Sequence, residues 1–291
     1  MSGEHNDAPR TADAPATPRI SVAMCTFNGE SYLREQIESI LRQSVAVDEI
    51  VVADDASTDG TRQMLEDYAR RLPQLFRLCL RDTNVGTIRN VEFALQQCRG
   101  EIIFLADQDD VWRPDKVATM LVRFRDPRCL LLFSDGRLVD PAGRPLGSTL
   151  WQKWQFTRWR RFLWRWIAGA AAFDLVFNNN KVTGATVAMR RSLLVHALAI
   201  RVPHGYWHDG WFAMHAAANR GLAFIPDQLI DYRIHPKQQV GLQQQVATKN
   251  ESEISFADFY RGFESQYPAC ATMVRALGFA SRAIAKLSPR S

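Results

Sequence analysis

The sequence predicts an α/β protein in which a mostly parallel β-sheet is flanked by helices. Two features indicate this fold class. Short, continuous apolar runs recur along the first half of the chain, and segments with apolar residues at helical spacing separate them. Strands without polar alternation are buried on both faces, which is typical of parallel sheets covered by helices. The contents of 46% hydrophobic and 23% charged residues are ordinary for a globular protein and exclude a disordered or collagen-like chain.

Five apolar runs are expected to form strands, and four amphipathic segments between them are expected to form helices. The predicted strands are residues 20–25, 50–53, 76–80, 102–106 and 130–134. The predicted helices are residues 31–43 and the segments around 64–72, 88–98 and 117–124. Ser57 or Thr58 is expected to be the N-cap of the second helix, because a hydroxyl can accept hydrogen bonds from the first backbone N–H groups.

Composition divides the chain into three parts. Residues 1–18 are rich in Ala, Pro, Asp and Thr and are expected to be a disordered leader without the apolar run of a signal peptide. Residues 19–240 carry the α/β pattern and include a basic, tryptophan-rich segment at 150–168. Residues 241–291 are expected to form a helical C-terminal extension, which packs either on the main domain or on a membrane.

Cysteine usage and hydropathy favour a cytoplasmic protein. The five cysteines are an odd number without a C-x-x-C pair, which is typical of reduced thiols and not of a disulfide scaffold. No run of about 18 apolar residues occurs, so no membrane-spanning helix is expected. The net charge of +5 is modest, so the placement of the basic residues matters more than their sum.

Three of the predicted strands are followed by segments that are polar except for Phe27. They are Thr26, Phe27 and Asn28 after the first, Asp54 and Asp55 after the second, and Asp107, Gln108, Asp109 and Asp110 after the fourth. Ligands of parallel sheets bind beyond the carboxyl ends of the strands, so these residues are expected to converge. Five carboxylates at one edge would repel each other strongly, and a divalent cation with oxygen ligands would relieve this repulsion.

Missing motifs exclude several common nucleotide sites. The sequence contains no G-x-G-x-x-G and no G-x-x-x-x-G-K-[ST], which argues against a Rossmann dinucleotide site and a P-loop. A nucleotidyltransferase would be expected to have a glycine-rich loop near the N-terminus, but residues 21–29 contain only Gly29. Residues 55–66 have the spacing of an EF-hand loop, but a strand and not a helix is predicted before them.

Four motifs in order resemble those of the family 2 glycosyltransferases, which have the GT-A fold. They are SVAMCTFNG at 21–29, VVADDASTDG at 51–60, NVG at 84–86 and DQDDVW at 107–112. The DQDDVW form is most similar to the bacterial rhamnosyltransferase-type branch. The resemblance covers about residues 20–241 and implies an inverting transferase that uses a nucleotide sugar and a divalent cation, Mn²⁺ or Mg²⁺. Ala56 stands where the family commonly has Gly.

The resemblance also implies roles for the residues in these motifs. The nucleotide-sugar site would comprise Thr26, Phe27, Asn28, Asp54, Asp55, Asp107 and Gln108. Phe27 would lie against the base, and Asp55 would accept a hydrogen bond from it. Asp107 and Asp109 match the Asp-x-Asp motif of the family, and Asp109 is expected to bind the metal directly. His235, in the family's Tyr-Arg-x-His pattern, would complete the metal site.

The acceptor side is expected downstream. The segment NNKVTGA at 179–185 resembles the acceptor-side strand and turn of the family and includes Gly184 and Ala185. His208, Asp209 and Trp211 open a helix rich in Ala and Met. Asp209 occupies the place of the family's general base, whereas from local sequence alone it would be a helix N-cap. Both roles can coexist at one helix start.

Five of the eight tryptophans lie in residues 151–166, where five basic residues and no acidic residue accompany them. A core helix with a solvated basic edge would explain this composition. A helix lying in a membrane interface would explain it as well, and nucleic-acid proteins also combine aromatic with basic residues. Contact with a membrane surface is favoured because a lipid-linked acceptor would account for it.

The sequence therefore predicts transfer of a sugar onto a cell-surface glycan in polysaccharide biosynthesis. The branch resemblance implies L-rhamnose from dTDP-L-rhamnose as the donor, and a UDP-hexose is the alternative. The acceptor is expected to be lipid-linked, at the cytoplasmic face of a membrane, and no nucleic-acid partner is expected. A non-catalytic module that binds a membrane surface or a nucleic acid is the alternative from another class.

Overall fold

The computed structural model describes residues 18–236, 238 and 254–287, so the predicted leader lies almost wholly outside the described residues. The strands are β1 (Ile20–Thr26), β2 (Glu49–Asp54), β3 (Phe76–Leu80), β4 (Ile102–Ala106), β5 (Val111–Trp112), β6 (Leu131–Val139), β7 (Pro145–Thr149), β8 (Val187–Arg190) and β9 (Leu222–Arg233). The main-domain helices are α1 (Leu33–Leu41), α2 (Thr61–Arg71), α3 (Thr87–Gln97), α4 (Lys116–Arg123), α5 (Leu150–Lys153), α6 (Arg158–Trp166), α7 (Ala170–Val176), α8 (Leu194–Ala197) and α9 (His208–Ala218), with short 3-10 helices η1 (Gly184–Thr186) and η2 (Arg191–Leu193). Helices α10 (Phe256–Gln266) and α11 (Pro268–Leu287) follow.

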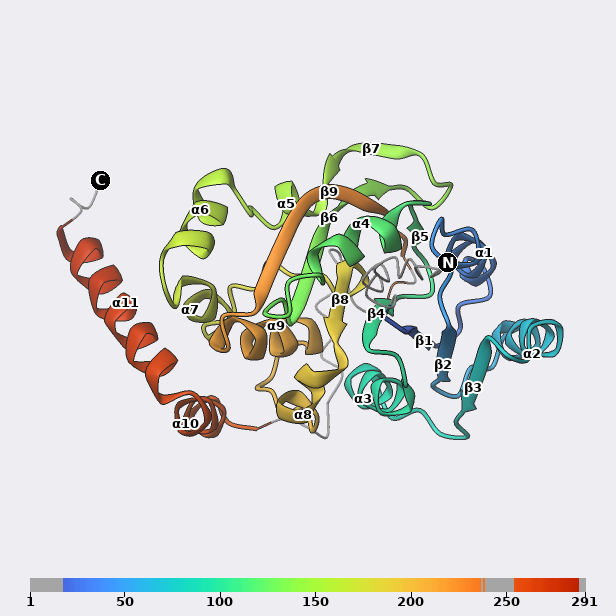
Figure 1. Ribbon diagram of the computed structural model, residues 1–291, viewed down its shortest axis with the longest axis horizontal. Coiled ribbons are helices and arrows are strands. Elements are labelled where there is room, and N and C mark those ends of the chain that lie inside the picture. The colour runs from blue at the N-terminus through green and yellow to red at the C-terminus, as the bar shows by residue number, and fades with distance from the viewer. Residues whose placement is uncertain (1–17, 237, 239–253, 288–291) are drawn as a thin grey trace, which may run out of the picture.

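One curled sheet runs through the molecule, with helices around it (Figure 1). Its strand order is β3-β2-β1-β4-β8-β6-β9-β5, and β7 pairs with β6. The first four strands in this order pair in parallel, and their carboxyl ends therefore lie at one edge. Strands β1, β2 and β4 are buried over almost their full length because helices cover them. The predicted α/β fold with a mostly parallel sheet is confirmed, and β3 and β4 have the predicted bounds.

The second half of the sheet mixes strand directions. Strand β8 pairs antiparallel with both β4 and β6, and β5 pairs antiparallel with β9. The long strand β9 pairs in parallel with β6, and register shifts interrupt this pairing after Ser134. Because β9 pairs with β5, its end lies beside residues 107–110, the acidic loop between β4 and β5. The residues after β9 thereby reach the carboxyl edge of the parallel strands.

The predicted start of the second helix is wrong. Helix α2 begins at Thr61, and Gly60 occupies the N-cap position. Ser57 instead donates its hydroxyl to the Asp54 carboxylate, and the Thr58 backbone N–H donates to the Asn28 side chain. The Ser57 hydroxyl also accepts the Asn28 backbone N–H, so residues 57 and 58 hold the loop after β2 against the loop after β1. They do not cap the helix.

The C-terminal helices pack on the main domain. Side chains of α10 and the first half of α11 are buried, among them Phe259, Phe263, Ala271 and Val274. Tyr267, between the two helices, lies with its hydroxyl 2.7 Å from His215 Nδ1 of α9. Helix α10 and the first half of α11 therefore pack on the domain. No helix in the described part of the chain is both long and apolar enough to cross a membrane.

Candidate active site

Asp54 organises the loops at the carboxyl edge of the sheet. Its Oδ2 accepts a hydrogen bond from Thr26 Oγ1 at 2.9 Å, and its Oδ1 accepts from Arg62 Nε at 2.9 Å and from the Ser57 backbone N–H at 3.0 Å. Asp54 is fully buried. Asp54 and Thr26 therefore hold the loops in place, and the Asp54 carboxylate does not present itself to a ligand as the resemblance implied.

Two further side chains tie neighbouring loops together. Asp55 accepts hydrogen bonds from the backbone N–H groups of Val85 at 2.8 Å and Gly86 at 2.9 Å. The Gln108 side-chain amide pairs with the backbone of Phe27, donating to its carbonyl at 3.0 Å and accepting from its N–H at 2.8 Å. Asp55 is buried, whereas the Phe27 ring is half-buried. An ionised carboxylate can accept about four hydrogen bonds, so Asp55 retains acceptor capacity toward a base.

The loop after β4 brings three carboxylates together in buried surroundings. Burial, with the nearby charges of Asp109 and Asp209, raises the pKa of Asp107 to about 7. Burial and the same kind of repulsion raise the pKa of Asp110 well above its ordinary value. Asp110 Oδ1 accepts the Arg233 backbone N–H at 3.0 Å, whereas its Oδ2 is buried without a hydrogen-bond partner. The predicted electrostatic strain between these acids is present.

A buried lysine that the sequence analysis did not single out lies among these acids. Lys116, in the first turn of α4, is fully buried and donates from Nζ to the Ala185 carbonyl at 2.7 Å. Burial lowers its pKa to about 7, although the charges of Asp110 and Asp107 oppose this shift. Its Nζ also lies 3.9 Å from the centre of the Trp112 ring. Lys116 offsets part of the negative charge and joins the acidic loop to η1.

Asp109 and His235 are the residues that fit a divalent cation best. Asp109 Oδ2 lies 2.9 Å from His235 Nε2, and both residues are buried. Arg233 fixes the acidic loop by donating from Nε to the Asp109 carbonyl at 2.9 Å. No group of three acidic, His or Cys side chains in the described part of the chain could hold a metal. The role of Asp107 as a third ligand stays a prediction, and substrate oxygens would complete the coordination.

Asp209 lies in the first turn of α9, beside the acidic loop. Its Oδ1 accepts hydrogen bonds from the Gly210 backbone at 2.6 Å and from Asn180 Nδ2 at 3.0 Å. The Gly184 backbone also donates to this carboxylate. Burial raises the pKa of Asp209, and these donors with the His208 charge only partly oppose that effect. The N-cap of α9 is Trp207, so Asp209 is not the capping residue that local sequence suggested.

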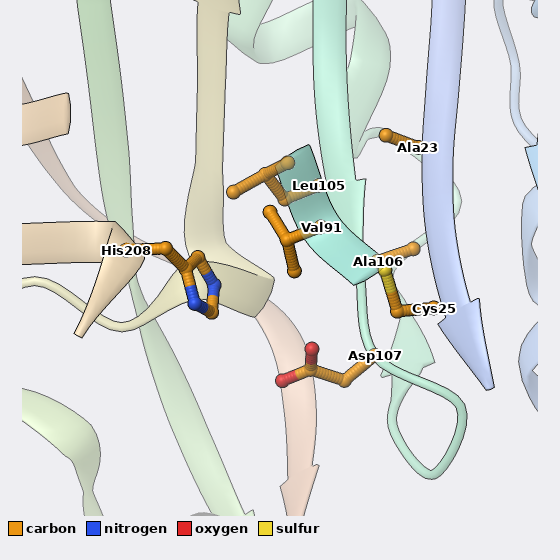
Figure 2. Close-up of a pocket in the computed structure, with 7 residues that line it drawn as sticks. All are labelled: Ala23, Cys25, Val91, Leu105, Ala106, Asp107 and His208. Atoms are coloured by element: carbon orange, nitrogen blue, oxygen red, sulfur yellow. The ribbon is translucent and has the colours of Figure 1, made fainter. Parts of the chain in front are cut away.

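Asp107 and His208 line one small pocket, together with five apolar or sulfur-bearing residues. Figure 2 shows the Asp107 carboxylate and the His208 ring pointing toward each other from opposite walls. His208 Nδ1 is buried without a hydrogen-bond partner. A Cβ added to Gly184 would come 3.0 Å from His208 Nε2, so η1 lies directly against the start of α9. Gly184, Ala185 and His208 therefore lie next to the loop that carries Asp107.

Trp211 lies on another side of α9, away from the acidic residues. Its indole N–H donates to the Ala197 carbonyl at 2.7 Å, and its ring packs on His215 and Phe259. Residues two positions apart project from a helix about 200° apart, so Trp211 and Asp209 face opposite sides of α9. Trp211 attaches α9 to α8 and α10, and these contacts do not support its predicted place on the acceptor side, which stays a prediction.

The sequence analysis missed Lys116, Asn180 and Arg233 as parts of this site. Asn180 lies within the quoted segment 179–185, and Arg233 within the Tyr-Arg-x-His pattern, so both had a local signal. Lys116 had none, because a lysine at the start of an amphipathic helix is ordinarily solvated.

The geometry defines a class of enzyme. The carboxyl edge of the parallel strands carries a loop that could receive a base and acids that could share a cation with a diphosphate. Asp209 adds a further carboxylate with a raised pKa beside these acids. These are the parts that transfer from a nucleotide-diphosphate donor requires.

The family model of glycosyl transferase family 2 matches residues 21–192, which is more than half of the chain. The chain belongs to this family. It is 28% identical over 219 residues to an uncharacterised protein of Mycobacterium tuberculosis, covering 74% of this chain and 59% of that relative. It is 30% identical over 129 residues to the putative teichuronic acid biosynthesis glycosyltransferase TuaG of Bacillus subtilis, covering 44% of this chain and 51% of that one.

Solved structures share the fold. Staphylococcus aureus TarS 1–349 in complex with UDP-GlcNAc is similar with a TM-score of 0.58 and 22% identity, covering 84% of this chain and 64% of that one. The mannosyltransferase PcManGT of Pyrobaculum calidifontis, in complex with GDP-Man and Mn²⁺, has a TM-score of 0.54 and 20% identity, covering 95% and 79%. The chain therefore has the GT-A glycosyltransferase fold.

Proposed function

We propose that this protein transfers a sugar from a nucleotide donor to an acceptor hydroxyl with inversion at the anomeric carbon. The position of Asp209 carries the proposal. It is a carboxylate with a raised pKa, and it lies close enough to Asp107, in the loop that also carries Asp109, to raise that residue's pKa too. The acceptor would approach Asp209, and the diphosphate would lie at the Asp109–His235 pair. A base on one side and a diphosphate site on the other suit a single displacement.

Asp209 has capacity for one further hydrogen bond. An ionised carboxylate offers about four acceptor positions, and Asn180, Gly210 and Gly184 donate to this one. The remaining position would receive the acceptor hydroxyl, whose proton passes to Asp209 as the oxygen attacks. The three donors hold the carboxylate in one orientation, and the raised pKa makes it a better proton acceptor.

Asp109 and His235 would hold a divalent cation, Mn²⁺ or Mg²⁺, together with the two donor phosphates. When bound, such a cation neutralises the charge that develops on the departing nucleoside diphosphate. The buried, unpartnered Asp110 Oδ2 and the mutual repulsion of the acids support a cation here. Asp107 contributes negative charge to this site.

Phe27, Asn28 and Asp55 would hold the nucleoside. We favour dTDP-L-rhamnose as the donor because the DQDDVW segment resembles the rhamnosyltransferase-type branch. A UDP-hexose is the second candidate, since TarS, which shares the fold, was solved with UDP-GlcNAc.

The acceptor would be a growing cell-surface glycan, for which the relationship to TuaG gives support. We propose a lipid-linked form, reached from the cytoplasmic face of the membrane.

A donor panel tests this function. Purified protein would be incubated with Mn²⁺ or Mg²⁺ and dTDP-rhamnose, UDP-hexoses or GDP-mannose, with and without lipid-linked glycan extract. Release of dTDP from dTDP-rhamnose, abolished by EDTA, supports the full proposal. Release from another donor keeps the transferase and refutes rhamnose. If no donor is turned over and calorimetry detects no cation-dependent nucleotide binding, the protein is a binding module and the proposal is wrong.

A further inference from the structure

Helix α6 displays two parallel stripes on its outer face. The arginines Arg158, Arg161 and Arg165 have i, i+3, i+7 spacing, and the aromatic residues Trp159, Phe162 and Trp166 repeat it one position later. Residues at this spacing share one face of a helix. The aromatic stripe is exposed, with 67% of Trp159, 48% of Phe162 and 68% of Trp166 accessible to solvent. None of the nine residues of α6 is buried.

The opposite face of α6 is committed to the fold. Trp164 packs on Phe156 and donates its indole N–H to the buried Asp174 at 2.6 Å. Arg160 forms an ion pair with the same carboxylate. A core role therefore explains Trp164 and Arg160, which belong to the inner face, but it leaves the two outer stripes without an explanation.

Within the arginine stripe, the charge of Arg161 opposes the rise that burial causes in the pKa of Asp135. Among the described residues, no acidic side chain forms an ion pair with Arg158, Arg161 or Arg165. The Arg161 guanidinium lies 4.9 Å from the centre of the Trp151 ring, and that of Arg165 lies 5.6 Å from the centre of the Phe224 ring. The charged ends of Arg161 and Arg165 therefore lie over aromatic rings of the protein, and Arg158 and Arg165 are the exposed members of the stripe. Positive charge beside exposed tryptophan is the composition of interfacial helices on anionic membranes.

We propose that the outer face of α6 binds an anionic lipid surface, with the aromatic stripe entering the headgroup region and the arginine stripe contacting lipid phosphates. Helix α6 lies in the half of the molecule that also holds α7, α10 and α11, away from α1 and α2 (Figure 1). Single-stranded nucleic acid would need open ring faces in a basic groove. Here the Trp159 and Phe162 rings stack on each other, with centroids 5.4 Å apart and an interplanar angle of 12°.

Vesicle flotation of the full chain tests this surface. The wild-type protein is expected to float with vesicles of phosphatidylglycerol and phosphatidylcholine, and to float much less with phosphatidylcholine alone. Changing Arg158, Arg161 and Arg165 together to Gln should weaken binding on the order of a hundredfold, because each basic residue near an anionic surface contributes about fivefold. Changing Trp159, Phe162 and Trp166 together to Ser should also abolish flotation.

A matched control distinguishes an effect of this surface on vesicle binding from an effect of the protein's net charge. Changing Arg42, Arg70 and Arg71 to Gln removes the same charge from α1 and α2 at the far end of the molecule. This variant should float like the wild type, and all variants should keep the wild-type circular dichroism spectrum and Tm. Equal losses in both arginine variants, or no flotation of the wild type, would overturn the proposal.

Two further outcomes would also overturn it. One is stripe-dependent binding of a single-stranded oligonucleotide without vesicle binding. The other is a solution dimer that dissociates when the aromatic stripe is changed. The surface does not depend on the proposed reaction, because flotation requires no donor, cation or turnover. Failure of either proposal therefore leaves the other intact.

Discussion

Replacing Asp209 by Asn isolates the proposed base from the architecture around it. The Oδ1 position keeps its two donors, Asn180 Nδ2 at 3.0 Å and the Gly210 N–H at 2.6 Å, because the amide oxygen of Asn accepts in the same place. At most the hydrogen bond from Gly184 is lost, at a cost of about 1 kcal/mol. Removing a buried charge offsets this cost, so Tm should change by no more than about 2–4 °C.

Turnover should fall far more than stability. A positioned general base contributes a factor of about 10²–10⁴, which corresponds to about 3–5.5 kcal/mol of barrier. Donor and cation affinities should change far less than turnover, because the proposed contact of Asp209 is with the acceptor and its effect on the donor site is limited to its charge acting on Asp107. The assay is nucleoside diphosphate release at saturating donor and acceptor, with calorimetry for nucleotide binding. Asp67→Asn, on the surface of α2, is the matched control and should retain full activity.

Two results would refute this reasoning. If Asp209→Asn retained more than a third of the wild-type kcat, another group would be the base. If it weakened nucleotide binding as much as turnover, Asp209 would belong to the donor site.

Three other perturbations follow from the same geometry. Asp109→Ala or His235→Ala should reduce Mn²⁺-dependent nucleotide binding at least tenfold in calorimetry; unchanged affinity would remove both from the metal site. Because burial raises the pKa of Asp209 and only its ionised form can accept a proton, kcat should decrease as the pH falls through that raised value. An acid limb at an ordinary Asp pKa, near 4, would contradict this. Arg160→Gln should destabilise the fold by about 1–3 kcal/mol in urea unfolding, since the buried Asp174 loses its ion pair but keeps the Trp164 donor; no loss would show that the pair is neutral.

The parallel half of the fold was readable because its central strands are largely apolar. Residues 102–106 became β4 without a shift in bounds, since burial on both faces leaves a continuous apolar signal. Residues 76–80 also became β3, although this edge strand contains Arg77 and is mostly half-buried. The second half was readable only in part, because residues 130–134 predicted the start of β6 and His208 the start of α9, whereas β7, β8 and β9 were not predicted. Strand β8 has four residues, and its antiparallel pairing with β4 joins residues more than 80 positions apart, which no local pattern encodes.

The site shows the same division. The loops after β1, β2 and β4 were located because strand ends meet at one edge of a parallel sheet. What each side chain does there depended on tertiary contacts. Asp54 belongs to a hydrogen-bond network internal to the loops, and Lys116 contacts Ala185, 69 residues away. Trp211 was predicted on the acceptor side because it is close to Asp209 in sequence. Two residues apart in a helix, however, the two side chains project from opposite faces of α9.

The Gln108 amide has a consequence for how the two halves of a donor would be held. It bonds both backbone groups of Phe27, so the loop proposed to hold the base and the loop proposed to hold the diphosphate form one mechanical unit. Ordering one loop reduces the entropy cost of ordering the other, and such coupling is reciprocal. Nucleoside and cation would therefore bind cooperatively, and a free nucleoside or a free cation would be held more weakly than the intact donor with its cation.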